Sequence, residues 1–141
     1  MIKRCPCCHA QIKRATSCSR CGADLNKVLK VDQFSRHYLL KAVQFLLNDE
    51  IEQSCRAINQ SLQLKKTQLA LVFRLFLIEQ QSQFVLDLLA NSQPFQAKQR
   101  LYHLQTLIPY SKKLQQLDAF SNYLLFKEPL IKSDYFYTPR G

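Results

Sequence analysis

Glycine is almost missing from this chain, which has only Gly22 and Gly141 in 141 residues. A phosphate-cradling loop needs several glycines, so the sequence excludes the usual nucleotide-binding motifs. Proline is absent from residue 23 to residue 93, and tryptophan is absent altogether. A stretch without helix breakers, rich in Leu, Gln and Lys, favours helices, and no alternating pattern predicts strands. The fold class we predict is therefore mainly α.

Acidic residues are also scarce, with 10 Asp and Glu against 20 Lys and Arg, and they are scattered. The three histidines, His9, His37 and His103, show no paired-ligand spacing on a helix. Cys55 lies on an apolar helical stripe, where a cysteine is usually a small core residue. We therefore expect a non-enzymatic protein that has no small-molecule substrate.

A long hydrophobic run is lacking as well. The longest apolar stretch, residues 69–78, is interrupted by Arg74 and is too short to span a bilayer. We expect the Arg74 side chain to lie at the rim of the core or to reach an acidic group. The first residues are charged or cysteine, so no signal peptide is expected. We therefore expect a cytoplasmic protein without a membrane span, in which cysteines bind metal rather than form disulfides.

Four of the six cysteines form two copies of one pattern. Cys-Pro-Cys-Cys-His-Ala-Gln-Ile (5–12) aligns without gaps on Cys-Ser-Arg-Cys-Gly-Ala-Asp-Leu (18–25). Two Cys-x-x-Cys pairs match the tetrahedral shell of one structural zinc ion. The alignment predicts four ligands and places Cys7 opposite Ser19, away from the metal. Alternative ligand sets, in which Cys7 or His9 replaces Cys8, remain open. The predicted ligands are Cys5, Cys8, Cys18 and Cys21.

Residues 5–25 resemble the short N-terminal zinc ribbons of many bacterial proteins, whose knuckles read Cys-Pro-x-Cys-Gly and Cys-x-x-Cys-Gly. The first copy departs from that pattern, because His9 stands where Gly22 stands in the second. The resemblance implies a structural zinc ion but no particular activity, since the attached domain varies. We assign the ribbon to residues 1–28 and expect it to be disordered without zinc.

After a short linker at 26–31, apolar stripes predict about six helices within residues 32–128. Their expected starts are Asp32, the turn after Asn48, Thr67, Ser82, Pro94 and Ser111. Connections of a few residues imply antiparallel neighbours, either a bundle or a stack of helical hairpins.

The first hairpin of this helical domain resembles a degenerate tetratricopeptide repeat. Two departures are Lys66, where the repeat usually has proline, and Phe76, where it has a small residue. The resemblance implies a concave helical face that grips a peptide or a helix. The residues that match the packing positions of that family are Tyr38, Ala42, Phe45, Ser54, Ile58 and Ser61.

The last segment, residues 129–141, is expected to be an aromatic tail, because Pro129 should end the helices. Its cluster of Tyr135, Phe136 and Tyr137 could anchor a partner or fold back over the helices of the chain itself.

The net charge of +10 is concentrated at the N-terminus, where residues 1–31 carry seven basic residues and one acidic residue, or +6. Such a surface attracts nucleic acid or an acidic protein face. The ribbon has no aromatic residue on which bases could stack, which favours an acidic protein face over nucleic acid. We therefore predict an adaptor in a larger assembly that binds a protein through its helices and a second partner through its basic ribbon; the alternative is a nucleic-acid-binding ribbon protein. The candidate contact residues are Lys3, Arg4, Lys13, Arg14 and Arg20.

Overall fold

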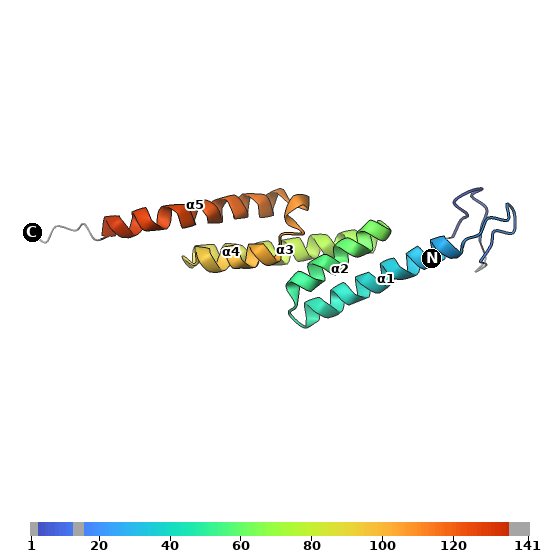
Figure 1. Ribbon diagram of the computed structural model, residues 1–141, viewed down its shortest axis with the longest axis horizontal. Coiled ribbons are helices and arrows are strands. Elements are labelled where there is room, and N and C mark those ends of the chain that lie inside the picture. The colour runs from blue at the N-terminus through green and yellow to red at the C-terminus, as the bar shows by residue number, and fades with distance from the viewer. Residues whose placement is uncertain (1–2, 13–15, 136–141) are drawn as a thin grey trace, which may run out of the picture. The chain divides into compact units, whose positions relative to one another are not determined.

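The computed structural model describes residues 3–12 and 16–135 of the chain (Figure 1). Within these ranges the protein is mainly α-helical and has no extended strand, which confirms the predicted fold class at this level. There are five α-helices rather than about six. The elements are α1 (Asn26–Leu47), α2 (Ile51–Leu64), α3 (Gln68–Ala90), α4 (Pro94–His103), the short 3₁₀-helix η1 (Ile108–Tyr110) and α5 (Lys112–Tyr135).

The chain divides into two compact units, residues 1–73 and 74–141, and α3 runs through the boundary. In the first unit α1 begins at Asn26, directly after the cysteine-rich segment. Leu25 and Leu29 pack against Cys5 and Cys18. The segment 26–31, expected to be a linker, is therefore the beginning of a helix whose first turns already belong to the core of the ribbon.

Helices α1 and α2 form an antiparallel hairpin (Figure 1). Small side chains lie between them, which lets the two backbones approach closely. The Ser54 hydroxyl donates to the Ala42 carbonyl oxygen at 2.7 Å, and the Ser61 hydroxyl donates to the Ser35 carbonyl oxygen at 2.7 Å. Ile58 is fully buried beside them. Four positions of the tetratricopeptide-like pattern are therefore buried in the hairpin, and the other two, Tyr38 and Phe45, are partly buried.

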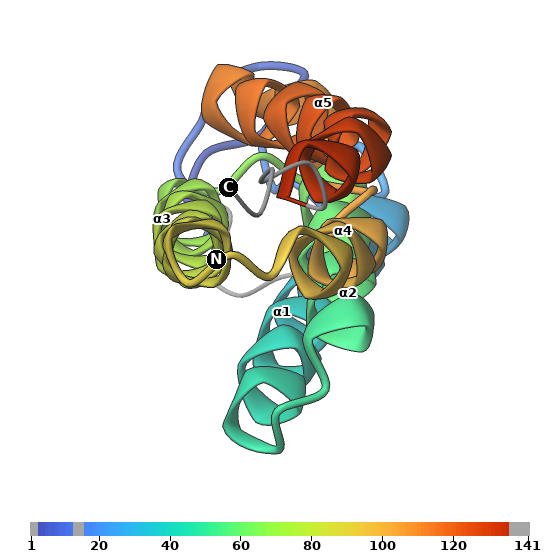
Figure 2. The same cartoon turned by 90° about the vertical axis from the view of Figure 1, so that its left-hand side faces the viewer.

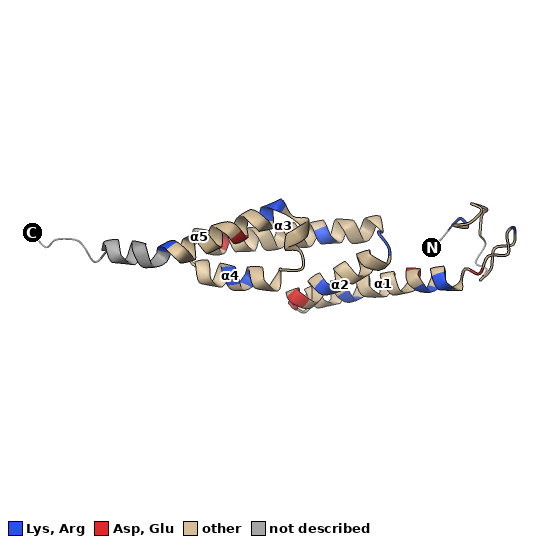
Figure 3. Ribbon diagram, turned by 45° about the horizontal axis from the view of Figure 1, so that its top comes forward, with Lys and Arg blue, Asp and Glu red and all other residues tan. Residues whose placement is uncertain are grey.

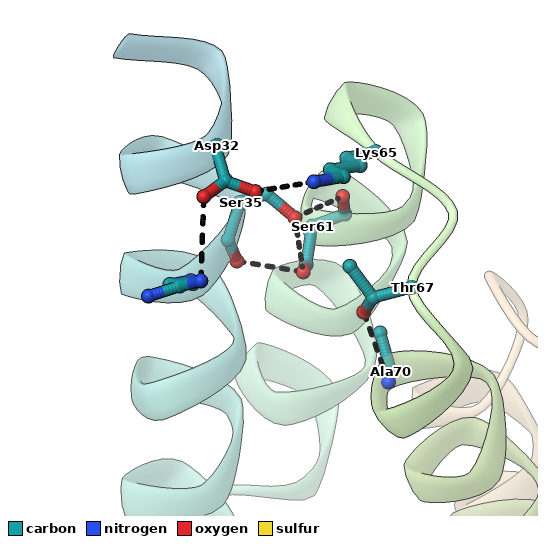
Figure 4. A network of polar contacts seen from close by, with 7 residues as sticks. Asp32, Ser35, Ser61, Lys65, Thr67 and Ala70 are labelled. Atoms are coloured by element: carbon teal, nitrogen blue, oxygen red, sulfur yellow. Dashed lines mark hydrogen bonds and ion pairs between the residues drawn. The ribbon is translucent and has the colours of Figure 1, made fainter. Parts of the chain in front are cut away.

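Asp32 lies inside α1 and does not begin it. Its carboxylate is buried and accepts a hydrogen bond from Lys65 Nζ at 2.6 Å, while Arg36 lies 3.4 Å away (Figure 4). The hydrogen bond from the Lys65 ammonium group lowers the pKa of Asp32. This ion pair joins the first half of α1 to the end of α2.

The third and fourth predicted helices are one continuous helix, α3. Thr67 caps its start, as predicted, because the Thr67 hydroxyl accepts the backbone N–H of Ala70 at 3.2 Å (Figure 4). The break expected at Ser82 does not occur, since neither glycine nor proline lies between residues 68 and 90. Ser82 is buried in the middle of the helix.

Helix α3 is also longer than the apolar run on which the expectation of no membrane span was based. Among the described residues it is the one helix with the length and composition to cross a bilayer. One third of the relevant window, 33%, is buried within the structure. A core helix of a water-soluble protein can have the same length and composition, although such a helix is mostly buried, so one helix of this kind is weak evidence for a span.

In the second unit α4 and α5 pack against each other (Figure 2). Pro94 occupies the first turn of α4, and Ser111 caps α5 by accepting the N–H of Leu114 at 3.2 Å, both as predicted. Lys98 and Asp118 form an ion pair between the two helices. The buried apolar residues of this unit include Leu101, Leu104, Leu107 and Leu114.

Helix α5 continues past Pro129 to Tyr135, so the expectation that Pro129 ends the helices is wrong. A proline removes one backbone hydrogen bond from a helix and does not oblige it to stop. The backbone at Tyr135 is therefore helical, and no side chain after residue 127 is described. Phe136 and Tyr137 lie outside the described residues.

Arg74, the one charge in the apolar stretch, has a partner inside the second unit. Its guanidinium lies over the ring of Tyr110, 4.2 Å from the centroid. Arg100 makes a similar contact with Phe84 at 4.6 Å and donates from Nε to Gln81 at 2.8 Å. Cation–π contacts therefore stabilise the guanidinium groups of Arg74 and Arg100, whose aromatic partners could not be predicted from the sequence.

Candidate metal centre

The two cysteine-containing copies fold as two matching turns. In the first, Cys5 N–H donates to the Ala10 carbonyl at 2.8 Å, and His9 N–H donates to the Cys5 carbonyl at 2.9 Å. In the second, Cys18 N–H donates to the carbonyl of Ala23 and Gly22 N–H to that of Cys18, both at 2.9 Å. The same bonds therefore recur thirteen positions later in the chain. The internal repeat in the sequence is a structural repeat.

Each turn is closed by a residue with a positive φ. Gly22 has φ +69°, as the spacing predicts, and His9 has φ +60° at the equivalent position. The left-handed conformation is free of steric cost for glycine and unfavourable for a residue with a Cβ atom. The departure from the family pattern at His9 therefore leaves the fold of the turn unchanged but loads it with strain.

The four predicted ligands come together at one point. The sulfur atoms of Cys5, Cys8, Cys18 and Cys21 all lie within 4.8 Å of one another. The Sγ atoms of Cys5 and Cys21 are 3.6 Å apart, and those of Cys8 and Cys18 are 3.5 Å apart. A zinc–sulfur bond of about 2.3 Å in a tetrahedron gives sulfur–sulfur edges of about 3.8 Å. The sulfur cluster therefore has the dimensions of a tetrahedral metal site.

Backbone N–H groups supply the favourable electrostatics of this cluster. Those of Cys21 and Arg20 lower the pKa of the Cys18 thiol to about 6. The N–H of Ala23 lowers the pKa of Cys21, but the sulfur atoms of Cys5, Cys18 and Cys8 and partial desolvation outweigh it and raise that pKa to about 12. The pKa of Cys5 is lowered by the N–H of Cys8, while that of Cys8 is raised.

Four thiolates this close would repel one another. A divalent cation at the centre would remove that repulsion and displace the protons of those thiols that still hold one. Four sulfurs with tetrahedral spacing suit zinc, or iron in the same geometry, and leave no open coordination position for a substrate. The chemistry of the donor set is therefore that of a structural metal site.

The two rival ligands lie outside the cluster. Cys7 and His9 are both exposed, and neither belongs to the group of metal-binding side chains found among the described residues. The backbone N–H of Cys7 donates a hydrogen bond to the Cys5 sulfur at 3.4 Å, so Cys7 contacts the sulfur cluster through its backbone and not through its thiol. This arrangement agrees with the pairing drawn from the sequence repeat.

Comparison with known proteins gives no further assignment. No family model matches the chain, and neither a curated protein nor a solved structure matches it. The zinc-ribbon and tetratricopeptide-like resemblances therefore depend on the residues and on the geometry described above.

The basic residues proposed for contacts with a second partner are only partly described. Lys3, Arg4 and Arg20 are exposed on the ribbon, whereas Lys13 and Arg14 lie outside the described residues. Sequence reasoning missed other exposed basic residues, because it treated 26–31 as a linker and did not continue the helical register backward. Counted from Asn26, that register places Lys27, Lys30, His37 and Lys41 on one side of α1.

Proposed function

We propose that this protein is a non-enzymatic, zinc-dependent adaptor. The observation that carries the proposal is the set of four sulfur atoms within 4.8 Å of one another, provided by two equivalent turns. A segment of this size has too small an apolar core to fold alone, so the metal supplies the missing stability. Zinc would hold the two turns together, and Leu25 and Leu29 would then join the ribbon to α1.

The helical part supports the adaptor role through its exposed apolar side chains. On α3, Leu69 is 67% exposed and Val72 is 54% exposed, three positions apart on one side of the helix. Apolar side chains that gather on a surface mark sites of protein interaction. Among the described residues no cluster of histidine, cysteine or acidic groups other than the four sulfurs offers a metal site. In this proposal the helices hold one protein and the ribbon a second partner.

The proposal is tested by comparing Cys18→Ser with Cys7→Ser. Cys18→Ser removes a predicted ligand and should lower bound zinc to roughly a tenth or less of the wild-type content, measured by elemental analysis. Circular dichroism should retain most of the helical signal, because the described helices lie outside the ribbon except for the first turns of α1. Cys7→Ser should keep both zinc and helix.

The same variants separate the two predicted partners. Proteins cross-linked to the wild type in its own cells should fall into two groups. One group should also be recovered with Cys18→Ser, through the helices, and the other should be lost with the ribbon. Recovery of the same proteins with both variants, or of none at all, would contradict an adaptor with two binding surfaces. Equal zinc in Cys18→Ser and the wild type would contradict the metal site.

A further inference from the structure

One face of α1 carries a row of exposed basic and aromatic side chains, which we call the α1 stripe. Its members follow one another at intervals of three and four residues, so they lie on one side of the helix. All of them are exposed, and Phe34 is 55% exposed. The stripe consists of Lys27, Lys30, Phe34, His37, Lys41 and Gln44.

The α1 stripe is turned away from α2. The buried residues of α1 are Asp32, Ser35 and Ala42, which face the hairpin partner. The exposure of Phe34 shows that this aromatic side chain does not belong to the core. A large aromatic side chain in water, with lysines on both sides in the stripe, has no structural role within the hairpin.

The charges of the stripe are not neutralised. It contains no acidic residue, and among the described residues Lys27, Lys30 and Lys41 take part in no ion pair. By contrast, Arg36, which lies off the stripe, is paired with Asp32. Lys27 and Lys30 also stand near the N-terminus of α1, where a cation opposes the helix dipole. Figure 3 shows basic residues along this part of α1. Neither an ion pair nor the helix dipole therefore explains the lysines at these positions.

We propose that the α1 stripe binds single-stranded nucleic acid. Lys27, Lys30 and Lys41 contact phosphates over a helix length of about 21 Å, and Phe34, between them, stacks on an unpaired base. A duplex offers no unpaired base to Phe34, so the single strand fits better. Lysine is depleted from protein interfaces and arginine is enriched there. The stripe has three lysines and no arginine. An acidic protein surface therefore fits the composition less well.

This inference goes beyond the proposed function, because it adds a nucleic-acid-binding surface on α1 to the two binding surfaces of the adaptor. It depends on the proposed function only for the zinc-held ribbon, from which α1 extends. The ribbon has no aromatic residue on which a base could stack. Phe34 on the neighbouring helix α1 provides an aromatic ring for that contact. Lys3, Arg4 and Arg20, which are exposed in the same compact unit, add positive charge.

The test is fluorescence anisotropy of the full chain with a labelled single-stranded oligonucleotide of roughly 15 nucleotides and its duplex. The wild type should bind the single strand more tightly than the duplex. The triple variant Lys27→Gln/Lys30→Gln/Lys41→Gln should bind at least tenfold more weakly near 0.1 M salt and lower the log–log salt slope by about 2, since each phosphate contact on a single strand contributes about 0.7.

Phe34→Ala should weaken single-strand binding by about tenfold and leave the salt slope unchanged, because stacking involves no counterion release. The matched control is Lys66→Gln/Lys112→Gln/Lys113→Gln, which removes the same charge from exposed positions off the stripe, of which Lys113 is paired with Glu79. It should weaken binding less than threefold.

Three outcomes would overturn the inference: no binding of either oligonucleotide at low salt, equal losses in the stripe and control variants, or a polyglutamate peptide that binds as tightly as the oligonucleotide and is insensitive to Phe34→Ala. Zinc content is measured in every sample. Normal zinc with failed binding contradicts the stripe alone, whereas absent zinc in the wild type contradicts the proposed function.

Discussion

His9 and Gly22 occupy the same place in two copies of one turn, and both have a positive φ. A residue with a Cβ atom pays about 1 kcal/mol or more for this conformation. The second copy avoids that cost and the first does not. The two halves of the metal site therefore share this backbone angle and differ in whether the residue that adopts it has a Cβ atom.

We predict that His9→Gly tightens zinc binding by roughly fivefold, which corresponds to about 1 kcal/mol. The histidine side chain is exposed and outside the sulfur cluster, so its removal loses no ligand. Competition with a chromophoric chelator measures the change.

Gly22→Ala is the matched control and should weaken zinc binding by a similar factor. A Cβ atom at Gly22 would meet nothing within 4 Å, so any loss comes from the backbone angle alone. If the two substitutions changed affinity in the same direction, the strain at these turns would not be what controls the site.

At the scale of elements, the hairpin of α1 and α2 is joined by a charged contact near one end. Asp32 is buried on α1 and Lys65 follows the last residue of α2. Because the bond from Lys65 lowers the pKa of Asp32, the folded hairpin prefers the ionised carboxylate. This preference contributes stability above the ordinary pKa of aspartate, 3.8, and the contribution disappears as the pH falls through the lower folded value.

We predict that Asp32→Asn lowers the free energy of unfolding by about 1.5 kcal/mol at neutral pH, the lower end of the range for a hydrogen bond to a charged group, because Lys65 is partly exposed. The difference from the wild type should shrink as the pH falls below about 4, because the wild-type carboxyl then becomes neutral too. Urea unfolding followed by circular dichroism at several pH values measures both effects.

Asp87→Asn serves as the control for that experiment. Asp87 is exposed on α3, and its carboxylate accepts a hydrogen bond only from the nearby Gln83 amide at 3.1 Å, so the substitution should cost less than about 0.5 kcal/mol. A difference between Asp32→Asn and the wild type that stays constant down to pH 3 would show that the ion pair is not its source.

Helix starts were predictable wherever a local signal decides them. Thr67, Pro94 and Ser111 mark the starts of α3, α4 and α5 because a hydroxyl cap or a fixed φ acts within one turn. Asp32 gave the same signal and was misleading, since its carboxylate pairs with a lysine 33 positions away. A cap residue and a buried ion-pair partner look alike in sequence.

Helix ends and continuity were harder to predict, because they depend on tertiary packing. Serine is a common helix cap, yet Ser82 is buried inside α3. Proline commonly ends helices, yet Pro129 lies inside α5. Packing outweighs the small local preferences at these positions. The predicted count of about six helices became five for this reason.

At the scale of the whole molecule, the candidate metal centre was the part most fully predictable. The spacing of Cys5, Cys8, Cys18 and Cys21, together with the internal repeat, determined which sulfurs meet. The α1 stripe was not predictable in the same way, because its register depends on α1 beginning at Asn26. That start in turn depends on Leu25 and Leu29 packing into the ribbon.

The account depends on a metal ion that completes the ribbon and so fixes the beginning of α1. Elemental analysis of the full chain, purified under reducing conditions without chelators, tests it most directly. We predict about one equivalent of zinc per chain, bound by the four sulfurs. A content far below one equivalent in reduced, folded protein would contradict the account.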